Sequence, residues 1–140
     1  MAPPNGYEII EHTADAGVRA LGATKAEAFA NAARGMYSLL TDPDRVGESE
    51  QRQIHLEDAD DGRLLERWLQ ELLFLTETEG LLFGRFEVAI DAGTLNATAH
   101  GERIDPGRHE LRGDIKGVTR HLTQVTRRDG SYEVSVLLDM

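Results

Sequence analysis

Hydrophobic and polar residues alternate in three short stretches of the chain, and a period of two is typical of strands. The stretches cover residues 7–12, 18–22 and 50–57. Small and turn-forming residues fill the loop between the first two, at residues 13–17. These patterns predict two strands joined by a tight loop at the start of the chain, and a half-buried strand further along.

Apolar residues recur at helical spacing in two longer segments. The first helix is expected to begin at a capping box, where the Thr24 hydroxyl and the Glu27 carboxylate can each satisfy a free backbone N–H. The second is expected to begin at Asp60 or Asp61 and to end at Gly80, which can adopt the left-handed conformation of a helix C-terminus. The predicted apolar faces consist of Ala28, Phe29, Ala32, Ala33, Met36, Tyr37, Leu39 and Leu40 in the first helix, and Leu64, Leu65, Trp68, Leu69, Leu72, Leu73 and Leu75 in the second.

The remainder of the chain contains only strand patterns, at residues 82–90, 95–103, 115–120, 122–128 and 132–138. Asp129-Gly130 favours a two-residue hairpin turn that would pair the last two strands antiparallel. The order of elements predicts an α+β fold of two layers, with two helices packed on a mixed, largely antiparallel β-sheet. No repeat or linker interrupts the pattern, so we expect a single domain.

Composition excludes several classes of protein. The chain has 140 residues, no cysteine, 25 acidic against 15 basic residues and a formal net charge of −10. Without cysteine there is no disulfide scaffold, thiolate zinc site or cysteine nucleophile. The acidic balance argues against a protein that binds nucleic acid by itself, since such binding depends on Lys and Arg neutralising phosphates. The sequence shows neither a signal peptide nor an apolar run long enough for a membrane span, so a cytoplasmic protein is expected.

Two acidic positions are candidates for a hard-cation site. Asp15 lies in the loop after His12, where a carboxylate and main-chain carbonyls can bind Ca²⁺ or Mg²⁺. Asp139 and Met140 follow an apolar strand and add further hard oxygen ligands. In the alternative interpretation, Asp15 only builds an Asx turn, His12 is an ordinary packed or surface histidine, and Asp139 is exposed at a frayed terminus.

Residues 101–128 carry a local excess of positive charge. Seven basic and four acidic residues give this segment a charge of +3, whereas the other 112 residues carry −13. Such a patch fits contact with a phosphate or nucleotide, or docking to an acidic partner. Alternating charges on the solvated face of a sheet are the alternative. The basic residues are Arg103, Arg108, Arg112, Lys116, Arg120, Arg127 and Arg128.

Several short motifs, taken together and in order, resemble those of the archease family. They span the chain from about residue 7 to its end, and although each is weak alone, this many in register are specific. The matching segments are 7–15 (YEIIEHTAD), 26–29 (AEAF), 31–33 (NAA), 68–75 (WLQELLFL), 78–80 (TEG), 101–103 (GER), 108–111 (RHEL), 116–121 (KGVTRH) and 138–140 (LDM).

The resemblance implies the archease fold, as one domain over residues 1–140 with a flexible terminus at 1–6. Archeases are small cytoplasmic accessory proteins of RtcB-type RNA ligases, which join RNA ends during tRNA splicing and RNA repair. They promote guanylylation and multiple turnover of the ligase and broaden its nucleotide use, without being ligases themselves. The resemblance therefore implies an activator that has no catalytic residues of its own, forms no stable nucleic-acid complex alone and does not enter a membrane.

The resemblance also implies a set of site residues. A divalent cation, calcium in the first place with Mg²⁺ or Mn²⁺ as alternatives, would be bound by Asp15, Asp139 and a main-chain oxygen of Met140. Lys116 and His12 would act on the partner ligase. Two other functions stay open at this point: a metal-dependent enzyme that processes phosphoesters or nucleotides, and a chaperone-like interaction module.

Overall fold

The computed structural model describes residues 5–11 and 15–140 of the chain. The strands in this part of the chain form two sheets, one in the order β1-β2-β7-β6 and the other in the order β3-β5-β4, and all neighbouring strands are antiparallel. The elements are β1 (Tyr7–Glu11), β2 (Asp15–Gly22), α1 (Lys25–Ser38), the 3₁₀ turn η1 (Pro43–Arg45), β3 (Glu50–Glu57), α2 (Asp61–Glu79), β4 (Leu81–Asp91), β5 (Thr94–Arg103), β6 (Gly117–Arg128) and β7 (Ser131–Asp139).

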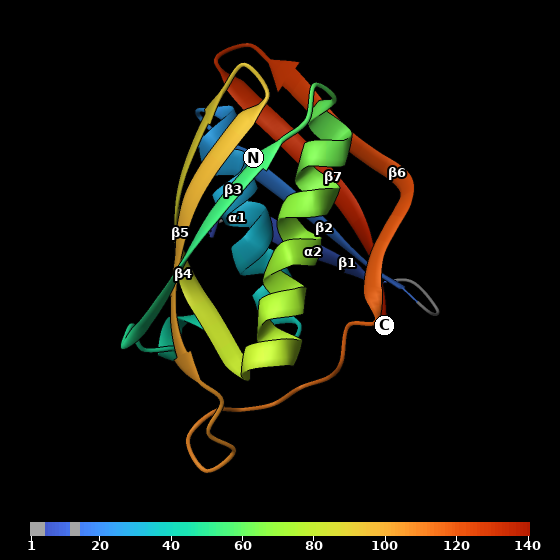
Figure 1. Cartoon of the computed structure of the whole chain (residues 1–140). Helices are drawn as coiled ribbons and strands as arrows, with labels where there is room; N and C mark the ends of the chain where they lie inside the picture. The colour runs from blue at the N-terminus through green and yellow to red at the C-terminus, as the bar shows by residue number, and fades with distance from the viewer. Residues whose placement is uncertain (1–4, 12–14) are drawn as a thin grey trace.

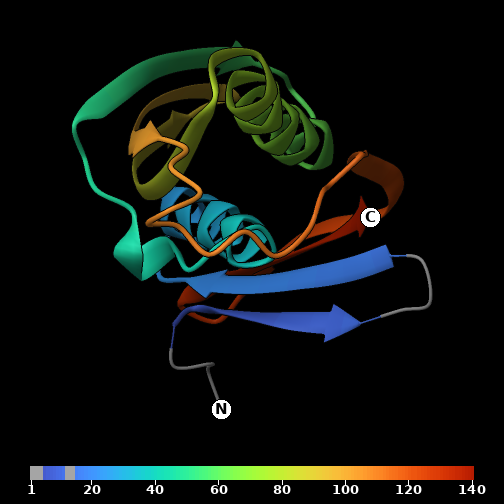
Figure 2. The ribbon, with the colours of Figure 1, turned by 90° about the horizontal axis from the view of Figure 1, so that it is seen from below.

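Both helices lie between the two sheets (Figures 1 and 2). α1 packs against β2 and β7 of the four-stranded sheet and against β4 of the other, whereas α2 packs against β6, β3 and β4. The expected α+β architecture, with two helices packed on antiparallel sheet, is confirmed. The division of the strands into two sheets is an addition, because the order of elements along the chain does not specify which strands pair.

The helix boundaries follow the predicted capping signals. The Thr24 hydroxyl accepts the backbone N–H of Glu27 at 3.0 Å at the start of α1. At the start of α2, the carboxylate of Asp60 accepts the backbone N–H of Arg63 at 2.9 Å. Gly80 ends α2 with a φ of 66°, in the left-handed conformation that glycine adopts without steric cost. The two caps and the glycine stop are confirmed.

Two large aromatic side chains tie the helices to each other in the core. The Tyr37 hydroxyl on α1 donates to the carbonyl of Leu72 on α2 at 3.0 Å. In the other direction, the Trp68 indole N–H on α2 donates to the carbonyl of Phe29 on α1 at 3.0 Å. Both side chains are fully buried, so these bonds satisfy polar atoms that would otherwise lose their water. Burial also raises the pKa of Tyr37 far above its ordinary value.

Strand β6 corrects one sequence prediction. The segments 115–120 and 122–128 are expected as two strands, but they form a single strand that pairs with β7 at both of its ends. Pairing is irregular between Thr119 and Gln124, where Leu122 has a φ of 64°. A positive φ is rare for a bulky side chain, so the backbone is locally distorted at this point. The break in the hydrophobic pattern therefore marks an irregularity within one strand.

The hairpin predicted for the last two strands is confirmed. Gly130, with a φ of 71°, closes the predicted hairpin between β6 and β7. The expected flexible terminus at 1–6 falls outside the described residues up to residue 4, and the carbonyl of Gly6 accepts the N–H of Leu21 at 2.8 Å. Neither helix of the described chain is long and apolar enough to span a membrane.

Candidate functional site

The predicted acidic residues meet at one end of the four-stranded sheet. Asp15, the first residue of β2, lies directly opposite Asp139, the last residue of β7. On the other side of β7, Asp139 lies opposite Gly117, the first residue of β6, and its carbonyl accepts the N–H of Lys116 at 2.7 Å. Figure 1 shows the C-terminus beside the start of β6. Residues that are about 100 positions apart in the sequence are thus neighbours across three adjacent strands.

The opposition of Asp15 and Asp139 places two like charges next to each other. Side chains directly opposite on antiparallel strands point to the same face of the sheet and lie roughly 5 Å apart at Cβ. Two carboxylates in this arrangement repel each other unless a positive charge lies between them. Carboxylate and main-chain oxygens are the ligands that hard divalent cations prefer, so the donor set fits Ca²⁺, Mg²⁺ or Mn²⁺.

The described residues contain no group of three or more His, Asp or Glu side chains arranged to hold a metal. A cation at Asp15 and Asp139 would therefore need main-chain oxygens or water to complete its coordination. Met140 directly follows Asp139, and its half-buried side chain packs against the core, which holds the end of the chain in place. Only a main-chain oxygen of Met140 can serve as a hard ligand.

Of the two residues predicted to act on a partner, Lys116 is among the residues that the structure describes and His12 is not. Lys116 is exposed, and its ammonium forms no ion pair with any residue in the described part of the chain. Its backbone is fixed beside Asp139, so the side chain starts from the same end of the sheet. His12 lies outside the described residues. The structure therefore brings together Asp15, Asp139, Met140 and Lys116 of the predicted set.

Residues 104–116 form a long segment that links the two sheets and ends at Lys116 (Figure 1). The segment has no regular structure, but it is attached at several points. The N–H of Ile104 donates to the carbonyl of Gly80 at 2.8 Å, and the N–H of Arg112 donates to the carbonyl of Leu40 at 2.9 Å. Ile115, next to Lys116, is only 2% exposed and anchors the end of the segment in the core.

A buried histidine forms a further anchor of this segment; it lies in the matching segment 108–111, but the sequence assigned it no role. His109 is 5% exposed. Its Nδ1 accepts the N–H of Asp105 at 2.9 Å, so the neutral ring carries its proton on Nε2, which lies 3.1 Å from a carboxylate oxygen of Glu102. Burial, together with the nearby Arg108 guanidinium, lowers the pKa of His109, although the Asp105 carboxylate opposes the shift.

This histidine predicts a pH dependence of stability. In the unfolded chain the pKa of His109 returns to about 6.5, so the unfolded state binds more protons below that pH. The free energy of unfolding that comes from neutral His109 is therefore fully present above about pH 6.5 and is lost as pH falls toward the lower folded-state pKa. Urea unfolding of the wild type and of His109→Gln at several pH values checks this. The wild type should lose stability more steeply below pH 6.5, and equal slopes would contradict the assignment.

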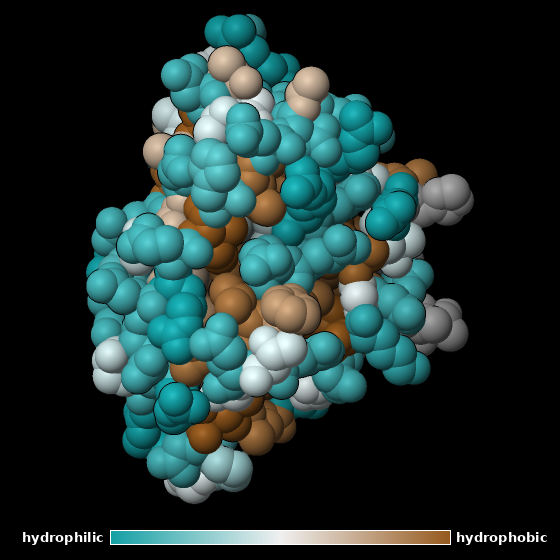
Figure 3. All heavy atoms as spheres, in the orientation of Figure 1, coloured by the Kyte–Doolittle hydropathy of each residue, from teal (hydrophilic) through white to brown (hydrophobic). Residues whose placement is uncertain are grey.

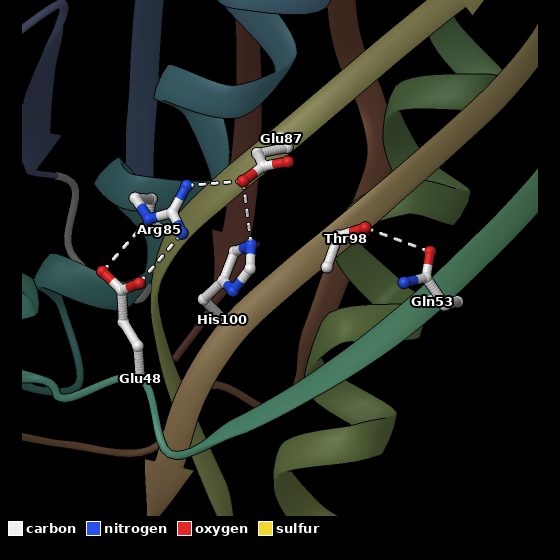
Figure 4. Close-up of polar contacts among 6 residues, drawn as sticks. All are labelled: Glu48, Gln53, Arg85, Glu87, Thr98 and His100. Carbon is white, nitrogen blue, oxygen red and sulfur yellow. Dashed lines mark hydrogen bonds and ion pairs between the residues drawn. The ribbon is translucent and has the colours of Figure 1, made fainter.

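Another polar cluster lies on the outer face of the three-stranded sheet (Figure 4). Arg85 bridges Glu48 and Glu87, and the ring of His100 contacts the same Glu87 carboxylate at 3.1 Å. The Arg85 guanidinium lowers the pKa of both carboxyl groups. Because these charges already neutralise one another in a solvated network, the cluster has the character of the polar face of a sheet.

The basic residues of segment 101–128 fall into a group with ion pairs and a group without them. Arg108, Arg112 and Arg128 pair with the carboxylates of Glu102, Glu110 and Glu133. In contrast, Lys116, Arg120 and Arg127 form no ion pair within the described residues. Part of the charge excess thus belongs to ordinary surface pairs, as in the alternative interpretation, and part of it is available to a ligand or partner.

Comparison with known proteins extends over almost the whole chain. The model of the archease protein family matches residues 7–140. The protein archease of Methanothermobacter thermautotrophicus is 40% identical over 139 residues, which cover 96% of this chain and 99% of that protein. The protein archease of Sulfurisphaera tokodaii is 37% identical over 136 residues, which cover 96% of this chain and 98% of that protein.

Two solved structures share the fold. The solution structure of Methanobacterium thermoautotrophicum protein 1598 superposes with a TM-score of 0.86 at 40% identity, covering 97% of this chain and 99% of that one. The crystal structure of an archease from Thermotoga maritima, described as a possible chaperone, superposes with a TM-score of 0.66 at 20% identity, covering 100% of this chain and 98% of that one. At the latter identity the likeness concerns the fold alone.

Proposed function

Because the chain belongs to the archease family, we propose that it is an accessory protein that activates an RtcB-type RNA ligase of tRNA splicing. In this role it promotes guanylylation and multiple turnover of the ligase and broadens the range of nucleoside triphosphates that the ligase uses. The ligase carries out the chemistry, and the chain itself supplies no catalytic residue. The cytoplasm is the proposed place of action.

The observation that carries the proposal is the meeting of Asp15, Asp139 and Lys116 at one end of the four-stranded sheet. Two carboxylates and one ammonium group come from three neighbouring strand ends, although nothing in the packing of the core requires polar residues there. An exposed lysine next to a pair of carboxylates suits contact with a partner that handles phosphates. The proposal assigns this end of the sheet to the contact with the ligase.

Within this contact, Asp15 and Asp139 would hold a divalent cation, for which calcium is our first candidate, together with a main-chain oxygen of Met140. The cation, when bound, supplies positive charge that offsets the repulsion between the two carboxylates. The anchored segment 104–116 holds the backbone of Lys116 beside Asp139. From there the flexible side chain can reach a phosphate or carboxylate of the partner. His12 is proposed to act on the partner as well.

Multiple-turnover RNA ligation by the cognate ligase, measured with and without the chain, tests the proposal. Addition of the chain should raise the number of ligations per enzyme. Unchanged turnover would overturn the proposal and leave the chaperone-like module as the better interpretation. Release of guanylate from GTP, or phosphodiester turnover, by the purified chain alone would instead favour a metal-dependent enzyme.

Lys116→Ala is expected to reduce the stimulation by about tenfold or more, because the lost ammonium contributes charge-assisted contacts to the partner. Lys25→Ala is the matched control, since Lys25 is the other lysine of the chain and pairs with Asp61 at 2.9 Å on a different element. The two variants should fold alike in thermal melts. Stimulation that falls equally in both variants would show that the effect is not specific to the site.

A further inference from the structure

A pocket of about 440 Å³ lies in the seam between α2 and β6, further along β6 than the sheet end that carries Asp15 and Asp139. Three arginines from the two elements line it, Arg63 and Arg67 from α2 and Arg120 from β6, together with the polar side chains of Gln70 and Thr123. In Figure 3, which has the orientation of Figure 1, hydrophilic side chains are interspersed with hydrophobic patches over these two elements.

Arg120, which lines this pocket, lies in the distorted stretch of β6. Pairing with β7 is irregular from Thr119 to Gln124, and the positive φ of Leu122 lies in the middle of this stretch. Leu122 is 71% exposed, so hydrophobic burial does not explain the strained conformation. Strained backbone persists where the surrounding structure or a function requires it. Here it accompanies an exposed guanidinium that forms no ion pair within the described residues.

The two arginines of α2 are only loosely held. Arg63 lies 3.4 Å and Arg67 3.8 Å from the carboxylate of Asp58, which both share. Their side chains are 68% and 47% exposed. Long ion pairs of exposed arginines contribute little to stability, so the Arg63 guanidinium can turn toward a ligand at small cost. Arg67 also donates to the carbonyl of Glu57 at 2.7 Å, a bond that leaves its other N–H groups for a ligand.

Carboxylates limit the positive charge of the pocket. Asp60 lines it, but its carboxylate is already bound to the N–H of Arg63 as the cap of α2. Glu66 also lines it and is 8% exposed. Asp58 pairs with Arg63 and Arg67 beside the pocket, so three carboxylates balance the three guanidinium groups. A site without net positive charge suits a ligand with one phosphate group better than an extended polyanion. Planar guanidinium groups bind phosphate oxygens in pairs, which matches a tetrahedral anion to this lining.

We propose that the pocket of Arg63, Arg67 and Arg120 binds a single phosphate group, carried by a nucleotide or by an RNA strand. The volume of the pocket is within the range typical of sites for small ligands. Because carboxylates balance the guanidinium groups, the affinity of the isolated chain should be no stronger than the order of millimolar. The proposal concerns binding by the chain alone and does not depend on the proposed action on a ligase.

Titration of the isotope-labelled full chain with inorganic phosphate, followed by NMR, tests the site. The backbone amides of Gly62, Arg120 and Thr123 should shift in a saturable way. Arg120→Gln should weaken binding by about tenfold, through loss of charge-assisted hydrogen bonds, and Arg120→Lys should restore part of it. Arg127→Gln is the matched control, since Arg127 lies on the same strand, outside the lining, and should change binding by less than about twofold.

Glu66→Gln gives a test with the opposite sign. Removal of the buried negative charge should tighten phosphate binding by about threefold to tenfold. A loss of affinity in this variant, an equal loss in Arg127→Gln and Arg120→Gln, or the absence of saturable shifts in the wild type would each overturn the proposal.

The source of the phosphate is distinguished by competition. Guanosine monophosphate, a short RNA with a terminal phosphate and the same RNA without it are compared as competitors of inorganic phosphate. Competition by the first two alone identifies a terminal phosphate, and equal competition by both RNAs identifies the phosphodiester backbone. Failure of all three to compete would contradict a nucleotide or RNA ligand.

Discussion

Calcium is expected to raise the melting temperature of the wild-type protein, and replacing Asp15 with asparagine is expected to abolish that rise. A cation bound only by the folded state stabilises it by about 2.7 kcal/mol when its free concentration is 100 times its dissociation constant. For a domain of this size that corresponds to a rise of roughly 8 °C. The variant lacks one of the two opposed carboxylates, so its melting temperature should be the same in calcium and in chelator.

The same substitution should have a different effect when no cation is present. In chelator, Asp15→Asn removes the repulsion from Asp139 across the strand pair and should stabilise the protein by roughly 0.2–1 kcal/mol. Asp129→Asn is a matched control, because it removes a carboxylate in the β6–β7 turn and leaves an Asn-Gly turn that is equally favourable. Met140→Ala should keep the calcium response, since the ligand proposed for this residue is a main-chain oxygen. If Asp15→Asn kept a full calcium response, the site assignment would be wrong.

Gly101→Ala is expected to destabilise the fold by about 3 kcal/mol, which lowers the melting temperature by roughly 10 °C. Gly101 lies in β5 opposite Phe83, beside the irregularity of β4 between Phe83 and Arg85. A Cβ at this position would overlap the carbonyl group of Leu82 and approach the ring of Phe83 to 2.9 Å. Neither neighbour can move away easily, because both belong to a buried strand.

A second glycine provides the control for this effect. Gly117 begins β6, and no atom lies within 4 Å of a Cβ added there. Gly117→Ala should therefore change the free energy of unfolding by less than about 0.5 kcal/mol. Thermal melts of the two variants under identical conditions check the comparison, and a small effect at Gly101 would mean that β4 can shift to accept the methyl group.

Local patterns in the sequence were sufficient for the individual elements. The caps at Thr24 and Asp60 and the stop at Gly80 mark the two helices, because each satisfies free backbone groups through residues close in sequence. The hairpin at Asp129-Gly130 is predictable for the same reason. The continuity of β6 was not predictable from local patterns. It depends on pairing with β7 on both sides of the irregular stretch around Leu122 and on packing against α2, and both are contacts between distant segments.

The candidate site shows the same division. The sequence identifies Asp15 as an acid in a loop and Asp139 as an acid at a strand end, and the family resemblance relates them to each other and to Lys116. The structure corrects the loop, because Asp15 is the first residue of β2. Only the pairing of β2, β7 and β6 puts the three side by side. The anchor of His109 on Glu102 and the pocket around Arg120 depend on contacts between residues that the sequence separates. These residues lie in segments that match the family, but no local pattern assigned them these contacts.

By itself, then, the sequence determined the type and approximate limits of the helices and most of the strands, the α+β class and the membership of the archease family. The tertiary structure decided that the strands form two sheets around the helices, that opposed carboxylates and a lysine share one sheet end, and that three arginines line one pocket. The physical reason is the separation along the chain between the residues that interact. Capping, periodicity and turns depend on neighbours a few residues away, whereas strand pairing and side-chain convergence depend on how distant segments pack into one core.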